Sequence, residues 1–85
     1  MQCFVYRSRR KPGAFLFVAD KDMLAELPAP LLSAFGQPEF SFEFELTPDR
    51  SLARADAKTV MQALVGQGYY LQMPPQDSLD EVRLD

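Results

Sequence analysis

The chain has 85 residues, of which 47% are hydrophobic and 25% are charged, and its formal net charge is −3. This length predicts one small domain over residues 1–85, and the apolar fraction with the low net charge excludes an intrinsically disordered chain. Because the sequence has no histidine and a single cysteine, it excludes a disulfide framework, a Cys/His zinc site and every histidine-based catalytic triad.

The longest uninterrupted apolar run, Ala14–Ala19, has six residues, whereas a membrane-spanning helix needs about 20. The first residues lack the basic start and long apolar stretch of a signal peptide. Together with the single thiol, these features predict a cytoplasmic protein with no membrane association and no disulfide partner.

Two short apolar runs near the N-terminus predict a β-hairpin. Cys3–Tyr6 and Ala14–Ala19 show no polar alternation, which is typical of strands covered at least partly on both faces. The segment between them, Arg7–Gly13, is basic and ends in a Pro-Gly turn signal.

Two short helices are expected next. Asp20 or Asp22 is positioned to cap the first helix, which must end before Pro28. Pro30 suits the first turn of the second helix, predicted over Leu31–Phe35.

The segment Glu39–Leu46 shows the clearest pattern in the chain, because polar and apolar residues alternate strictly. The apolar set is Phe40, Phe42, Phe44 and Leu46, and the polar set is Glu39, Ser41, Glu43 and Glu45. A period of two predicts a strand with one buried aromatic face and one wet acidic face. Each ring can bury about 150–250 Å², so we expect the three phenylalanines to anchor the core.

A third helix and a fourth strand complete the pattern. Asp56 is positioned to cap a helix that runs through about Gln67, and Tyr69–Met73 predicts a strand that the following proline pair ends. The tail, Gln76–Asp85, could form a helix or fray. The predicted class is α+β, a small α/β/α sandwich with the order β-β-α-α-β-α-β and an optional C-terminal helix.

The first candidate site is the basic hairpin loop. Its side chains could contact an anion or an RNA backbone, with a tyrosine stacking on a base. Alternatively, the charged side chains are simply hydrated on a soluble turn and pair loosely with the acidic strand. The sequence favours this second interpretation. The residues concerned are Tyr6, Arg7, Arg9, Arg10 and Lys11.

The acidic residues Glu39, Glu43, Glu45 and Asp49 form a second candidate site. They could hold Mg²⁺ or act as an acid and a base. Carboxylates on a solvent-facing strand also discourage edge pairing, and the sequence favours that explanation. Cys3 lies at the start of an apolar strand, and the chain has no histidine that could activate its thiol. We therefore expect a buried structural thiol.

The last candidate is an aromatic and polar surface for a protein partner near the end of the fourth strand. One of the two tyrosines must face the core, and the other could lie beside the glutamine and the prolines. The residues concerned are Tyr69, Tyr70, Gln72, Pro74 and Pro75. A packed strand end with no partner remains the alternative.

Three segments together resemble the bacterial YcgL domain family. They are Cys3–Ser8, Phe35–Pro38 and the string Gly-Tyr-Tyr-Leu-Gln-Met-Pro-Pro at residues 68–75, with Ala55-Asp56 at the matching spacing. The resemblance covers essentially the whole chain. It implies a small cytoplasmic α/β/α sandwich from proteobacteria and supplies no catalytic or cofactor residues. Some family members are encoded beside ribonuclease D, which hints at RNA metabolism.

These observations favour a binding or adaptor domain over an enzyme, with a protein partner whose identity the sequence does not give. No catalytic residue, cofactor or metal ligand is predicted. The alternative function is an RNA-associated accessory factor that uses the basic hairpin loop, and binding should then weaken steeply with salt. The second alternative is a Mg²⁺-dependent carboxylate hydrolase that uses Glu43, Glu45 or Asp49.

Overall fold

A computed structural model describes residues 1–52 and 55–74 of the chain. The predicted element order is confirmed, with a 3₁₀ helix in the place of the first α-helix. The elements are β1 (Gln2–Ser8), β2 (Phe15–Val18), η1 (Lys21–Glu26), α1 (Ala29–Phe35), β3 (Pro38–Glu45), α2 (Ala57–Gly66) and β4 (Tyr69–Gln72). The predicted C-terminal helix and Pro75 lie outside the described residues.

Two aspartates begin helices as their positions in the sequence predict. The Asp20 carboxylate accepts a hydrogen bond from the Asp22 backbone N–H at 2.9 Å, at the start of η1. The Asp56 carboxylate accepts from the Thr59 backbone N–H at 3.1 Å, at the start of α2. Each cap satisfies a backbone donor that has no partner within the first turn of its helix.

The four strands form one antiparallel sheet in the order β3-β1-β2-β4. β1 and β2 are the central strands, which explains why the sequence of each carries apolar residues on both faces. β3 and β4 form the two edges. Within the described residues, β3 is twice as long as β4, with eight residues against four.

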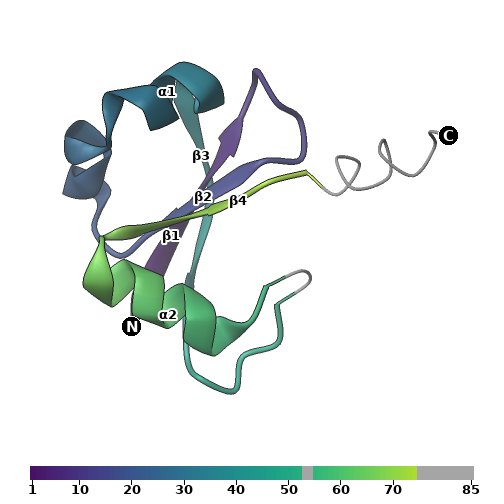
Figure 1. Cartoon of the computed structure of the whole chain (residues 1–85). Helices are drawn as coiled ribbons and strands as arrows, with labels where there is room; N and C mark the ends of the chain where they lie inside the picture. Colours follow the sequence, from purple (N-terminus) through teal and green to yellow (C-terminus); the bar gives the residue numbers. More distant parts are fainter. Residues whose placement is uncertain (53–54, 75–85) are drawn as a thin grey trace, which may run out of the picture.

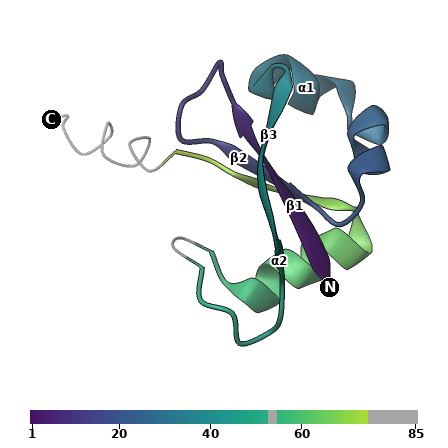
Figure 2. The same cartoon turned by 180° about the vertical axis from the view of Figure 1, so that it is seen from behind.

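Helices cover both faces of the sheet, which gives three layers. Figures 1 and 2 show α1 and η1 on one side of the strands and α2 on the other. We name the faces after these helices. The α2 face carries Cys3, Val5, Phe15, Phe17, Phe42, Phe44, Tyr70 and Gln72. The α1 face carries Phe4, Tyr6, Leu16, Val18, Phe40, Tyr69 and Leu71.

A β-bulge in β3 overturns the prediction that this strand has one aromatic and one acidic face. Val5 pairs with Phe42 and the next β1 residue, Tyr6, pairs with Phe40, so Ser41 is the extra residue on β3. Beyond the bulge the side chains exchange faces. Phe40 therefore lies on the α1 face beside Tyr6, with the ring centroids 5.5 Å apart.

The expectation that three phenylalanines of this strand anchor the core is also wrong. Phe40 is 50% exposed and Phe42 is 48% exposed, and only Phe44 is partly buried against the core. The physical reason is the position of β3 at the sheet edge, where, among the described residues, it pairs with a strand on one side alone. The core residues of largest volume with less than 2% exposure are instead Leu16, Leu46, Val5, Val18, Val60 and Cys3.

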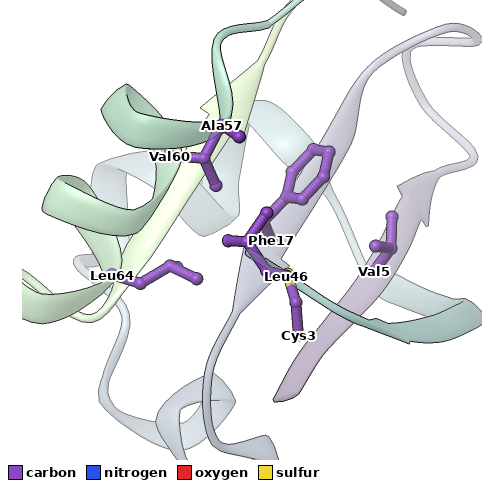
Figure 3. Close-up of a cluster of buried hydrophobic side chains, with 7 residues drawn as sticks. All are labelled: Cys3, Val5, Phe17, Leu46, Ala57, Val60 and Leu64. Atoms are coloured by element: carbon purple, nitrogen blue, oxygen red, sulfur yellow. The ribbon is translucent and has the colours of Figure 1, made fainter. Parts of the chain in front are cut away.

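The core under α2 is compact at one end of the sheet. Figure 3 shows Ala57, Val60 and Leu64 pointing from the helix toward Phe17 and Leu46. Val5 belongs to the same cluster but lies on the side away from the helix in this view. The α2 face is thus only partly covered, and its uncovered part forms the candidate site.

Candidate functional site

The uncovered part of the α2 face contains a pocket of about 290 Å³. Every strand contributes to it, and the loop after β3 forms one wall. The lining residues are Val5, Phe15, Phe17, Phe42, Phe44, Arg50, Ser51, Leu52 and Gln72. Apolar side chains dominate this list, and we call the hollow the aromatic pocket.

The pocket is built from both buried and exposed residues. Val5 and Phe17 are 1% and 7% exposed and belong to the core under the pocket, whereas Phe42 on the edge strand is half exposed. The rings of Phe42 and Phe44 lie 5.8 Å apart with a tilt of 31°. Phe42 pairs with Val5 and Phe44 pairs with Cys3, so the register with β1 sets both rings on the face of the pocket.

Arg50 is the charged group of the aromatic pocket. Its guanidinium lies over the Phe44 ring, 4.6 Å from the centroid, in cation–π geometry. No carboxylate within the described part of the chain forms an ion pair with Arg50, so its charge is available to an anionic group of a ligand. A planar guanidinium held on a ring keeps its hydrogen-bond donors in a fixed orientation, which suits binding of a carboxylate.

The predicted partner surface is divided by the sheet. Tyr70 and Gln72 lie on the α2 face, where Tyr70 packs edge-on against Phe17 at 5.9 Å and Gln72 lines the aromatic pocket. Tyr69 lies on the α1 face and packs against the core there. Pro74 is buried. Tyr69 and Tyr70 therefore lie on opposite faces of the sheet, and Pro75 lies outside the described residues. A partner surface that includes Tyr70 and Gln72 stays a prediction.

The basic hairpin loop is largely engaged within the protein. Arg7 and Arg9 both pair with Glu39, at 3.0 and 3.4 Å, and Arg10 donates to the Ser33 backbone carbonyl at 2.5 Å. The Glu39 carboxylate offsets one of the positive charges that a phosphate would meet. The use of Arg7, Arg9, Arg10 and Lys11 in anion binding stays a prediction.

Tyr6, which was expected beside the basic loop, is only 6% exposed and belongs to the core of the α1 face. Burial raises the pKa of its hydroxyl. A ring in this position cannot stack on a nucleotide base without local unfolding, because its faces are already covered by protein.

The bulge also separates the acidic residues of β3. Glu39 lies on the α2 face beside Arg7, while Glu43 and Glu45 lie on the α1 face. The Glu43 carboxylate accepts from the Gln2 amide at 3.0 Å, and the Glu45 carboxylate pairs with the N-terminal ammonium at 2.7 Å. Across residues 1–52 and 55–74, no group of three or more candidate ligands could hold a metal ion. Hydrolysis with Glu43, Glu45 or Asp49 remains a prediction that this geometry does not support.

Cys3 has no exposed surface, and burial raises the pKa of its thiol to about 11, although the nearby N-terminal ammonium acts in the opposite direction. The protonated thiol is not a nucleophile at neutral pH. This agrees with the expected structural role.

Sequence reasoning missed most of the aromatic pocket. Phe42 and Phe44 were assigned to the core, and Phe15 and Arg50 received no role in a site. One signal could have directed attention to them, namely that the pattern over residues 39–46 carries more aromatic residues than a half-exposed edge strand requires.

No helix among the described residues is both long enough and apolar enough to span a membrane. The fold and the aromatic pocket therefore define a small α+β domain with a hollow on one sheet face and no assembled set of reactive groups in the part that is described.

A sequence profile of the YcgL domain matches residues 3–75, and the chain belongs to this family. A YcgL domain-containing protein of Thioalkalivibrio sulfidiphilus is 52% identical over 77 residues, which cover 91% of this chain and 95% of the relative. A relative from Stutzerimonas stutzeri is 49% identical over 86% of this chain and 75% of its own length. Another, from Yersinia enterocolitica, is 44% identical over 88% of this chain and 83% of its own length. The family assignment confirms the resemblance found in the sequence.

Proposed function

We propose that this domain is a non-catalytic binding module that seats a large apolar side chain of a protein partner in the aromatic pocket. The observation that carries the proposal is the pocket itself, which has a volume of about 290 Å³ and mainly apolar walls. Pockets of this kind, with a few polar groups on the rim, are typical ligand sites. The buried, protonated thiol of Cys3 fits a cytoplasmic location, where thiols stay reduced.

Arg50 supports a more specific ligand. An arginine stacked on Phe44 at the pocket wall, with no carboxylate partner in the described residues, complements a negative charge. We therefore propose that a carboxylate of the partner also pairs with Arg50 at the pocket wall. The RNA hypothesis receives less support, since Glu39 pairs with two of the loop arginines and the net charge is negative.

The experiment is an NMR titration of the isotope-labelled protein with three small probes at millimolar concentration. N-acetyl-phenylalanine offers a ring and a carboxylate, its amide offers the ring alone, and N-acetyl-alanine offers the carboxylate alone. We expect shifts at the amides of Val5, Phe15, Phe42 and Gln72 with the first probe, smaller shifts with the second, and none with the third.

Three variants test the assignment. Phe42→Ala should weaken binding of both ring-bearing probes, and Arg50→Gln should remove the preference for the free carboxylate. Val65→Ala is the matched control, because Val65 is 75% exposed on α2 and does not line the pocket. Absence of shifts with N-acetyl-phenylalanine, or equal shifts with all three probes, would contradict the proposed function.

A further inference from the structure

The outer edge of β3 has a backbone orientation that its pairing with β1 determines. The Leu46 backbone N–H donates to the Met1 carbonyl at 2.7 Å, and the Met1 ammonium donates to the Leu46 carbonyl at 2.9 Å. Hydrogen-bonded and non-hydrogen-bonded pairs alternate along an antiparallel ladder. Glu45, opposite Gln2, and Glu43, opposite Phe4, therefore occupy non-hydrogen-bonded positions. Their N–H and C=O groups point outward from the sheet.

These outward groups are free to accept another strand. Within residues 1–52 and 55–74, the backbone groups of Glu43 and Glu45 form no hydrogen bond to a neighbouring element. Unpaired backbone groups along a strand edge are a template for pairing with another chain. At eight residues, β3 is long enough to pair with an extended peptide.

The two sides of this edge differ in chemistry. On the α2 face, Phe42 and Phe44 border the edge and line the aromatic pocket. On the α1 face, the carboxylates of Glu43 and Glu45 border it. Cross-strand neighbours on one face contact each other, and opposite charges or paired apolar groups there are favourable. An added strand should therefore place apolar side chains beside the phenylalanines and basic side chains beside the glutamates.

We propose that β3 binds an extended segment of a protein partner as a fifth strand, and that this segment alternates basic and apolar residues. The inference rests on the proposed function, because the apolar residues of the segment are those that would enter the aromatic pocket. Glu43 contributes most of the charge selectivity. Among the described residues its carboxylate pairs with the neutral Gln2 amide alone, whereas that of Glu45 already pairs with the N-terminal ammonium.

A second copy of the chain fits this edge poorly. An antiparallel pair of β3 strands centred on Phe44 sets Glu43 of one copy opposite Glu45 of the other, with both side chains on the same face. Like charges directly opposite each other are destabilising. The charge pattern of the edge thus selects a basic strand over an identical one.

The probes are five blocked heptapeptides. Acetyl-KVKFKVK-amide carries the proposed pattern, acetyl-EVEFEVE-amide reverses its charges, and acetyl-KSKSKSK-amide removes its apolar groups. The fourth and the fifth are N-methylated versions of the first peptide. Each carries N-methyl groups at alternate residues, and the two versions block opposite edges of the strand. We expect binding of the first peptide, with slowed hydrogen exchange at the Glu43 and Glu45 amides. Methylation of the pairing edge should weaken binding about tenfold or more, since it removes several backbone hydrogen bonds.

Charge-reversed variants test the selectivity. Glu43→Lys should weaken binding of the lysine peptide about threefold or more and improve binding of the glutamate peptide. Glu26→Lys makes the same charge change at an exposed residue of η1 and should have a much smaller effect. Equal responses of the two variants would show that only the net charge matters and would overturn the inference.

The outcomes separate the two proposals. If N-acetyl-phenylalanine binds but no heptapeptide does, the pocket function stands and strand addition is wrong. If the lysine peptide binds without slowed exchange at Glu43 and Glu45, or binds equally well in both methylated versions, strand addition is also wrong. A concentration-dependent dimer with protected Glu43 and Glu45 amides would identify a second copy as the occupant and contradict the proposed partner.

Discussion

The two faces of the sheet are both rich in aromatic and aliphatic residues, yet two helices cover one of them and a single helix covers the other. On the α1 face, η1 and α1 together cover a core that includes Tyr6, Leu16 and Phe35. On the α2 face, a single helix of ten residues covers one end and leaves the aromatic pocket at the other. The comparison shows that covering helices, and not strand composition, decide which aromatic residues become core.

The lengths of the helix and the strands explain why α2 leaves part of its face open. A helix of ten residues is about 15 Å long, whereas the seven residues of β1 and the eight of β3 extend for about 23–27 Å. One such helix cannot cover the whole length of these strands. Part of the α2 face therefore stays open unless another group, such as a ligand side chain, covers it.

The largest expected effect comes from a pair of truncations on the two faces. Leu16→Ala, at a position with no exposed surface on the α1 face, should lower the free energy of unfolding by about 3 kcal/mol. Phe42→Ala, on the open part of the α2 face, should lower it by less than about 1 kcal/mol, because the ring is half exposed. Urea denaturation measures both. A loss at Phe42 as large as that at Leu16 would mean that the aromatic pocket is part of a closed core.

The second prediction concerns the closed end of the α2 face. Burial raises the pKa of Cys3 from 9.0 to about 11, so the folded protein keeps the thiol proton over a range in which the unfolded chain has lost it. This contribution to stability is complete below pH 9 and is lost as the pH rises to 11. The loss amounts to about 2 kcal/mol.

The measurement compares the free energy of unfolding of the natural sequence and of Cys3→Ala across this pH range. The difference between the two proteins isolates the thiol from the other groups that titrate there. A difference that does not change between pH 9 and pH 11 would show that the thiol is not buried from solvent.

The smallest expected effect concerns Gly68, in the turn from α2 to β4. Through Met23 of η1, this turn connects the two helical layers. Gly68 has a φ of +96°, and a Cβ built on it lies 2.8 Å from the terminal methyl carbon of Met23 in η1. We expect Gly68→Ala to destabilise the protein by about 1–2 kcal/mol, since it adds backbone strain and displaces the methionine. Gly66→Ala is the matched control.

Gly66 is helical, and a Cβ at this position meets nothing within 4 Å. Its replacement should be neutral or should stabilise α2 by up to about 1 kcal/mol. Thermal unfolding distinguishes the two variants. Equal melting temperatures would show that the turn adapts freely and does not link the layers through Met23.

Most of the fold could be predicted from local patterns. The Pro-Gly turn, the capping aspartates and the proline after the fourth strand act on neighbouring residues, so each leaves a signal in the sequence that needs no tertiary information. The candidate site could not be predicted in the same way. The sequence singled out Gln72 for a partner surface, but its neighbours in the pocket, Phe15 and Arg50, come from segments far apart in the chain.

The sequence by itself determined the identity and order of the strands and helices, because hydrophobic period, capping and turn chemistry are local properties. Only the tertiary structure decided which face each residue of β3 occupies. The bulge at Ser41 arises from pairing with β1, and one extra residue in one strand reverses every side chain beyond it. The same long-range pairing set β3 at the edge of the sheet, where rings that the alternation pattern assigned to the core became the wall of a pocket.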